Sequence, residues 1–286
     1  MTSKTKGVLW FLGITFGLAW LCELGALLLG FSLTNLAVQL PVAFSPAIAA
    51  VIVRRWITGE GFRDAGNSLR LRSGWFYYLM AAILPMMGIL VPVALVALLG
   101  LYRPDFTALR GLFFGVELPV WGVMLLLTGV CVLLAPVFWG EEFGWRSYLQ
   151  LRLWSERPLL SAVVTGLIWG AWHYPLAFTG YSDNPNVALA ILLNFTLANV
   201  LLAIVLAWLR LRSGSVWPAC IAHAGNNLIV GTLADVPFVE GGKLDPSVVA
   251  LLLLSPLAAI CAWIVLGGQL KATKAVDVQP DATKSW

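Results

Sequence analysis

Long apolar stretches alternate along the chain of 286 residues with short segments that hold most of the charged side chains. A helix needs roughly 20 apolar residues to cross the hydrocarbon core of a bilayer. Eight stretches come close to that length, and each is predicted to form a transmembrane helix. They comprise about residues 8–29, 37–54, 75–100, 119–140, 159–178, 187–209, 216–233 and 247–268. The pattern predicts an all-α, polytopic membrane protein, folded as a single membrane domain over residues 1–286.

The composition supports this class. Hydrophobic residues make up 60% of the chain and charged residues 11%, whereas about 25% of the residues of a soluble domain are charged. The net charge of +4 does not indicate nucleic acid, because the basic residues are spread between apolar segments and form no patch with interleaved aromatic side chains. The predicted partner is membrane lipid.

The distribution of Lys and Arg predicts the orientation. If the N-terminus is inside, 15 basic residues fall on the inner side and three, Arg103, Arg110 and Lys243, on the outer side. Inner loops of membrane proteins are enriched in Lys and Arg. With an even number of spans, both termini are expected in the cytoplasm, and the polar tail over about residues 271–286 is expected to be disordered. The compact chain, without organelle signals, suggests a prokaryotic plasma membrane.

The first group of candidate reactive residues closes the fourth apolar stretch, which is predicted to continue as a helix to Trp154. Glu142 and Arg146 are four residues apart, so they share a helix face and are expected to form an ion pair. Glu141 is rotated by about 100° from Glu142 and is predicted to face a cavity, where desolvation would raise its pKa and suit it to act as a general base. The other interpretation of this sequence alone is a charged helix end at the membrane interface.

Two further motifs carry the histidines of the chain. Trp169 and His173 are four residues apart, and so are His223 and Asn227. Each pair is therefore expected to project from one helix face. Alone, the first motif would suit a structural histidine and the second a polar contact between helices. Ionisable groups inside a membrane nevertheless indicate a functional site by default.

A depth estimate relates the three motifs. From the inner helix ends, Glu141 and His173 are expected at about 20 and 22 Å at a rise of about 1.5 Å per residue. His223 is only about 9 Å from Trp217 by the same estimate. The three groups can therefore meet only if the seventh helix starts deeper or is tilted.

The ordered motifs resemble those of the CPBP intramembrane proteases, which include type II CAAX prenyl endopeptidases and bacterial Abi proteins of bacteriocin processing and immunity. The resemblance consists of EExxxR from Glu141 to Arg146, an aromatic-xxx-His motif from Trp169 to His173, and HxxxN from His223 to Asn227. The family pattern usually has Phe where this chain has Trp169. The eight predicted spans also agree with the family, whose core would cover about residues 119–268.

The resemblance implies an intramembrane endopeptidase that cleaves near the cytoplasmic side. Glu141 and His173 would activate a water, His223 and Asn227 would stabilise the oxyanion, and Glu142, Arg146 and Trp169 would support them around a buried active-site cavity. The substrate would be a peptide or protein, either prenylated or otherwise embedded in the membrane.

Other interpretations remain open at this stage. No HExxH zinc signature is present, so a mechanism without a cofactor is preferred, although Glu141, His173 and His223 would also make a zinc set. A transporter, an immunity protein or a non-catalytic scaffold would use the same buried groups to relay protons or bind a ligand. Glu23 is expected either to pair with a neighbouring helix or to remain protonated, and Asn194 and Asn199 are expected to bond neighbouring helices; all three are expected to lie outside the site.

Overall fold

The computed structural model describes residues 2–100, 118–176, 185–233 and 246–270. These residues form helices and turns and contain no strand. The helices are α1 (Ser3–Leu28), α2 (Leu36–Ile52), η1 (Val53–Ile57), η2 (Arg63–Ala65), α3 (Leu71–Leu98), α4 (Val120–Gly144), η4 (Trp145–Leu149), α5 (Gln150–Arg152), α6 (Pro158–Trp172), α8 (Pro185–Ser213), α9 (Trp217–Gly225), η5 (Asn226–Val230), α10 (Gly231–Leu233) and α11 (Pro246–Leu266). The predicted disordered tail and the three outer basic residues lie outside the described ranges.

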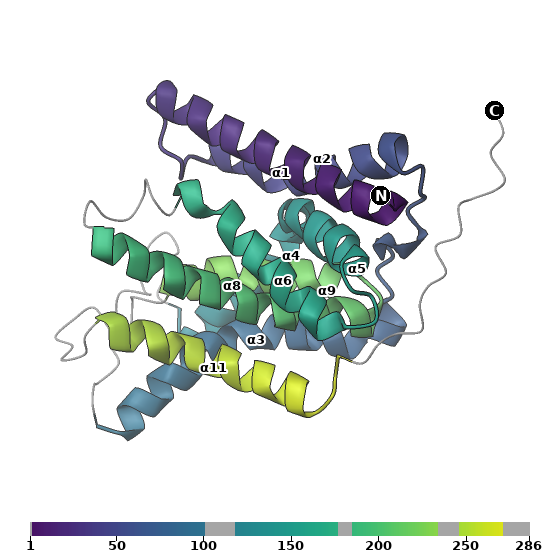
Figure 1. Ribbon diagram of the computed structural model, residues 1–286. Helices are drawn as coiled ribbons and strands as arrows, with labels where there is room; N and C mark the ends of the chain where they lie inside the picture. Colours follow the sequence, from purple (N-terminus) through teal and green to yellow (C-terminus); the bar gives the residue numbers. More distant parts are fainter. Residues whose placement is uncertain (1, 101–117, 177–184, 234–245, 271–286) are drawn as a thin grey trace.

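The helices form a bundle in which α4 and α9 are central (Figure 1). α1 and α2 pack together along one edge, and α2 also packs on α4. α11 lies along the opposite edge, against α3 and α8, while α6 packs mainly against α8. The segment that holds the three motifs is therefore enclosed by helices from both ends of the chain.

Each of the eight predicted spans coincides with helix in the structure. In the described residues, five helices are long and apolar enough to cross a membrane, namely those over 3–28, 36–57, 71–98, 120–152 and 192–213. The apolar helices Pro158–Trp172 and Leu251–Leu266 are shorter. The all-α, polytopic membrane fold is thus supported, whereas the count of eight spans stays a prediction.

Local sequence explains where several helices begin. The side chain of Thr2 accepts a hydrogen bond from the backbone N–H of Thr5 at the start of α1, and that of Asn35 accepts one from Ala37 at the start of α2. These side chains satisfy N–H groups that have no partner within the helix. α6 starts with Pro158, which needs no such partner.

Two glycines bring α4 very close to α2. A Cβ atom on Gly140 would lie 2.7 Å from the carbonyl oxygen of Ala43, and one on Gly144 would collide with Pro46. Small residues are what allow helices in a membrane to approach closely. The acidic pair of α4 therefore lies at the tightest part of the contact between these two helices.

Helix η4 and helix α5 continue α4 without a break, so one helix extends from Val120 to Arg152. The predicted extension of the fourth span is thus present and ends two residues before Trp154. It contains a π-turn over Trp145–Leu149, and two similar turns follow α2 and α9. Turns of this kind are rare and are often found at functional sites.

The start of α9 resolves the difference in predicted depth. The indole Nε1 of Trp217 donates to the carbonyl oxygen of Asn67, at 2.8 Å, and that of Trp139 donates to the side-chain oxygen of the same residue, at 3.1 Å. α9 therefore begins close to Trp139, two residues before Glu141. A deeper start of this helix brings His223 to the level of the acidic pair.

Candidate active site

A cavity of about 520 Å³ opens between the helices and is lined by residues of all three motifs. Glu141, His173, His223 and Asn227 each contribute to its wall. Glu142 and Arg146 lie behind it and are fully buried. The structure thus brings together the four residues predicted to be catalytic, although they are up to 86 positions apart in the chain.

Trp169 connects Glu141 to His173. Its indole Nε1 donates a hydrogen bond to Oε2 of Glu141, at 2.7 Å. Its carbonyl oxygen lies 2.9 Å from Nδ1 of His173. A carbonyl can only accept, so Nδ1 of His173 carries the hydrogen, and Nε2 of the neutral ring is left with a free lone pair. One residue therefore orients both a carboxylate and an imidazole with an unprotonated nitrogen.

Glu142 holds His223 and Arg146 in place. Its Oε1 lies 3.0 Å from Nδ1 of His223, and its Oε2 lies 3.3 Å from Nε of Arg146. The predicted ion pair between Glu142 and Arg146 is therefore present. The guanidinium of Arg146 also lies 4.5 Å from the ring centre of Trp169, close enough for a cation–π interaction.

The side chains that surround the ring of His223 come from other helices, and Asn227 has a different contact. Its ring is 2% exposed and meets the rings of Phe138 and Trp169 edge-on, with centres 4.9 and 5.0 Å away. The Asn227 side chain is exposed, and its Oδ1 accepts a hydrogen bond from Nδ2 of Asn226 at 3.3 Å. Both asparagines line the cavity.

The expectation that Glu23 and Asn199 lie away from the site is wrong, because both line the same cavity. Asn199 donates to the carbonyl oxygen of Phe195 in its own helix, at 2.8 Å, so it does not bond a neighbouring helix through that donor. Glu23 reaches the cavity because α1 packs beside the end of α6. One signal in the sequence could have assigned Glu23 to the site: it is an acidic residue, the first of the chain, within an apolar stretch.

The predicted zinc set does not form a metal site with the side chains as they lie. In the parts of the chain that the structure describes, no three His, Cys, Asp or Glu side chains are arranged to hold a metal ion. Nδ1 of His173 faces a backbone carbonyl, and Nδ1 of His223 faces Glu142. A zinc ion on Glu141, His173 and His223 would require these side chains to move.

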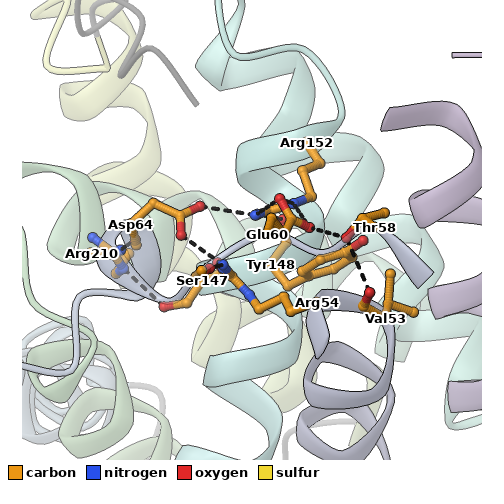
Figure 2. A network of polar contacts seen from close by, with 10 residues as sticks. Val53, Arg54, Thr58, Glu60, Asp64, Ser147, Tyr148, Arg152 and Arg210 are labelled. Carbon is orange, nitrogen blue, oxygen red and sulfur yellow. Dashed lines mark hydrogen bonds and ion pairs between the residues drawn. The ribbon is translucent and has the colours of Figure 1, made fainter. Parts of the chain in front are cut away.

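An ionic network fixes the helix immediately after the acidic pair (Figure 2). Nη2 of Arg54 donates to the carbonyl oxygen of Ser147, at 2.8 Å, and Nε of Arg210 donates to the hydroxyl of the same residue, at 3.0 Å. Asp64 accepts from Arg54 at 2.7 Å and from Arg152 at 3.0 Å, while Arg152 also pairs with Glu60. We call this set the arginine network; it comprises Arg54, Glu60, Asp64, Ser147, Arg152 and Arg210.

The network sets the charge state of Asp64, which lies in η2 between two spans. Burial raises the pKa of this carboxyl, but the hydrogen bond from Arg54 and the charges of Arg152 and Arg54 together outweigh burial. The pKa of Asp64 is therefore lower than usual. Asp64 stays ionised and bridges α2 to the end of the long fourth helix.

The apolar helices and the cavity between them define the chain as an integral membrane protein of helical fold, with the candidate polar residues in the cavity wall. Residues 119–229 match the family model described as "Type II CAAX prenyl endopeptidase Rce1-like". The chain thus contains an Rce1-like domain, which confirms the resemblance to the CPBP family. The match covers all three motifs, from Glu141 to Asn227, but not Glu23. No curated protein matches the chain at a significant level.

Proposed function

We propose that this protein is an intramembrane endopeptidase that hydrolyses a peptide bond with a water activated by Glu141 and His173. The observation that carries the proposal is the pair of hydrogen bonds through Trp169, which orient a carboxylate and a free imidazole nitrogen at the wall of one cavity. The Rce1-like domain supports a peptide substrate.

In the proposed reaction, Nε2 of His173 accepts a hydrogen bond from the water, and Glu141 takes the proton as the water oxygen attacks the carbonyl carbon. Glu141 then passes this proton to the amide nitrogen, the C–N bond breaks, and the former water oxygen stays on the new carboxyl group. General acid–base catalysis of this kind contributes roughly 10²- to 10⁴-fold.

His223 and Asn227 are proposed to stabilise the oxyanion that forms during the attack. Nδ1 of His223 faces the carboxylate of Glu142, so Nε2 is a donor only when the ring carries both protons. Glu142 orients the ring through this contact, and Arg146 balances the charge of Glu142. Each such donor is worth roughly 10²- to 10³-fold in rate.

We further propose that the chain forms eight spans, with both termini in the cytoplasm and cleavage near that side. The meeting of Arg54, Arg152 and Arg210 in one network supports the shared side assigned to them from the sequence. The protein would belong to a prokaryotic plasma membrane, with a catalytic core over about residues 119–268.

The test is cleavage of prenylated and unprenylated membrane peptides by the purified protein in detergent. Wild type is compared with Glu141→Ala and His173→Ala, with and without a chelator. Glu156→Ala is the matched control, because Glu156 is an exposed carboxylate in the loop before α6. We expect both site variants to lose cleavage and the control to keep it.

Three results would overturn the proposal or change its mechanism. Cleavage that survives Glu141→Ala would exclude the proposed base. No cleavage of any peptide, with Glu141 still required in cells, would favour the transporter, immunity protein or scaffold instead. Loss of activity with the chelator would replace the metal-free mechanism by one that uses zinc.

A further inference from the structure

Glu23 is the carboxyl group of the cavity that the proposed reaction leaves unused. Its side chain is 2% exposed, it lines the cavity, and its Oε2 has no hydrogen-bond partner among the described residues. Glu141, in contrast, receives the indole N–H of Trp169. Burying a carboxyl without a partner is costly, and such groups inside membranes tend to mark a functional contact.

A hydrogen bond fixes the position of Glu23 relative to the reacting groups. Nε1 of Trp20 donates to the carbonyl oxygen of Trp172, at 3.0 Å, and Trp172 directly precedes His173. Glu23 follows Trp20 by three residues, so the two share a face of α1. Glu23 lies about 4.5 Å further along the helix than Trp20, and it lines the same cavity as His173 and Glu141.

The charge of the cavity wall indicates what Glu23 would bind. Among the described residues that line the cavity are the carboxyls of Glu23 and Glu141, but no Lys or Arg. Gln39, from α2, already donates Nε2 to the carbonyl oxygen of Leu33, at 2.6 Å. The α1–α2 side of the cavity therefore offers a carboxylate without a cation to balance it, which favours a positively charged hydrogen-bond donor.

We propose that Glu23 is a specificity-determining residue that binds a basic side chain, Lys or Arg, of the peptide substrate near the scissile bond. This inference rests on the proposed endopeptidase function, because it takes the occupant of the cavity to be a peptide. The basic side chain completes the hydrogen bonding of the carboxylate and balances its charge. Hydrogen bonds to charged groups of this kind correspond to about 10- to 100-fold in affinity.

The experiment measures binding separately from cleavage. The full-length protein in detergent carries Glu141→Ala, so that peptides stay intact. Its affinity is measured for fluorescent peptides that are identical except for Lys, acetyl-lysine or norleucine at one position, and this position is moved along the peptide. At one or more positions, we expect the Lys peptide to bind about 10- to 100-fold more tightly than the other two.

Protein variants then identify the residue responsible. Glu23→Gln has nearly the same shape, and we expect it to bring the ratio between Lys and norleucine peptides close to one. Glu23→Lys is expected to reverse the preference, towards peptides with Glu at that position. Glu156→Gln removes an exposed carboxylate outside the cavity and should leave the ratio unchanged. The norleucine peptide reports in each variant whether the cavity is still formed.

Three outcomes would overturn the inference: equal binding of Lys, acetyl-lysine and norleucine peptides at every position, a preference that survives Glu23→Gln, or a preference that Glu156→Gln also removes. Equal binding would show that Glu23 does not bind a basic side chain. Cleavage by wild type separates this inference from the proposed function. A Glu23-dependent preference without cleavage would support the binding site and reject the protease function. Cleavage without any preference would support the protease function and reject the binding site.

Discussion

Two buried arginines of one continuous helix, Arg146 and Arg152, are paired in opposite ways. All three guanidinium nitrogens of Arg152 donate hydrogen bonds, to Glu60, Asp64 and the carbonyl oxygen of Tyr148. In the described structure, none of the three nitrogens of Arg146 has a hydrogen-bond partner, although its charge lies beside Glu142 and over the ring of Trp169.

The two regions therefore differ in how rigidly they hold their arginine. Directional hydrogen bonds fix geometry, and the arginine network uses them to hold the end of the helix to the loop before α3. The pair at the cavity is held by charge and ring contact, which tolerate small displacements. Native proteins leave few buried polar groups unpaired, and such groups call for an explanation. For Arg146, we propose that the reason is catalysis: its charge supports Glu142, which contacts the proposed catalytic residue His223.

The largest expected effect is that of Glu141→Gln, which should lower activity without lowering stability. The amide oxygen still accepts from Trp169, so the fold is expected to keep its thermal stability, but the side chain no longer takes a proton. Peptide cleavage should fall by roughly 10²- to 10⁴-fold, measured as kcat in detergent beside an unfolding curve. Activity within tenfold of wild type would show that Glu141 is not the base.

Asn227→Ala is expected to lower kcat by roughly 10²- to 10³-fold, with a small change in KM, because an oxyanion donor acts mainly in the transition state. Asn226→Ala is the matched control, since the two neighbours both line the cavity. A larger loss in the control would transfer the role of donor to Asn226.

Arg54→Ala should affect stability more than any substitution at the cavity. It leaves the carbonyl oxygen of Ser147 without the donor from Arg54 and leaves Asp64 with Arg152 alone, and breaking a buried pair of this kind costs roughly 3–5 kcal/mol. The free energy of unfolding in detergent measures the effect. Arg55→Ala removes an exposed arginine and should change stability little; equal effects would contradict the importance of the network.

The smallest expected effect is the response of the network to acid. The pKa of Asp64 in the folded protein is lower than its usual value of 3.8. Its carboxylate therefore adds stability at pH values above 3.8, and this contribution is lost as the pH falls through the lower folded value.

Unfolding midpoints measured from pH 7 down to about pH 2 would test the sign. Asp64→Asn should be less stable at pH 7 and should lose less stability on acidification than wild type. An equal acid loss in both proteins would assign the effect to other carboxyls, of which Glu60 is the nearest in the network.

The sequence predicted well what depends on a single helix. The apolar stretches fall on the observed helices, and the four-residue spacing of Glu142 and Arg146 produces the ion pair. It did not predict the contact between Glu142 and His223, which are 81 positions apart, because spacing reports only neighbours on the same helix. Glu23 was expected outside the site for the same reason, because whether it lines the cavity depends on which helix α1 contacts.

The π-turns also limited what spacing alone could predict. One of them begins at Asn226, between His223 and Asn227, so the second residue does not continue the α-helical step from the first. One turn of this kind closes its hydrogen bond over one residue more than an α-turn. The expectation that His223 and Asn227 project together from one helix face stays a prediction.

The π-turn over Trp145–Leu149 has a consequence for comparing this chain with its relatives and for redesigning it. A relative with an ordinary α-turn there would have one residue fewer, so the correct alignment would carry a single-residue gap next to the acidic pair and not in a loop. Conversely, deleting one residue from the turn is expected to replace it with an ordinary α-turn. Arg152 would then stay on the face that meets Glu60, and the acidic pair upstream would keep its place.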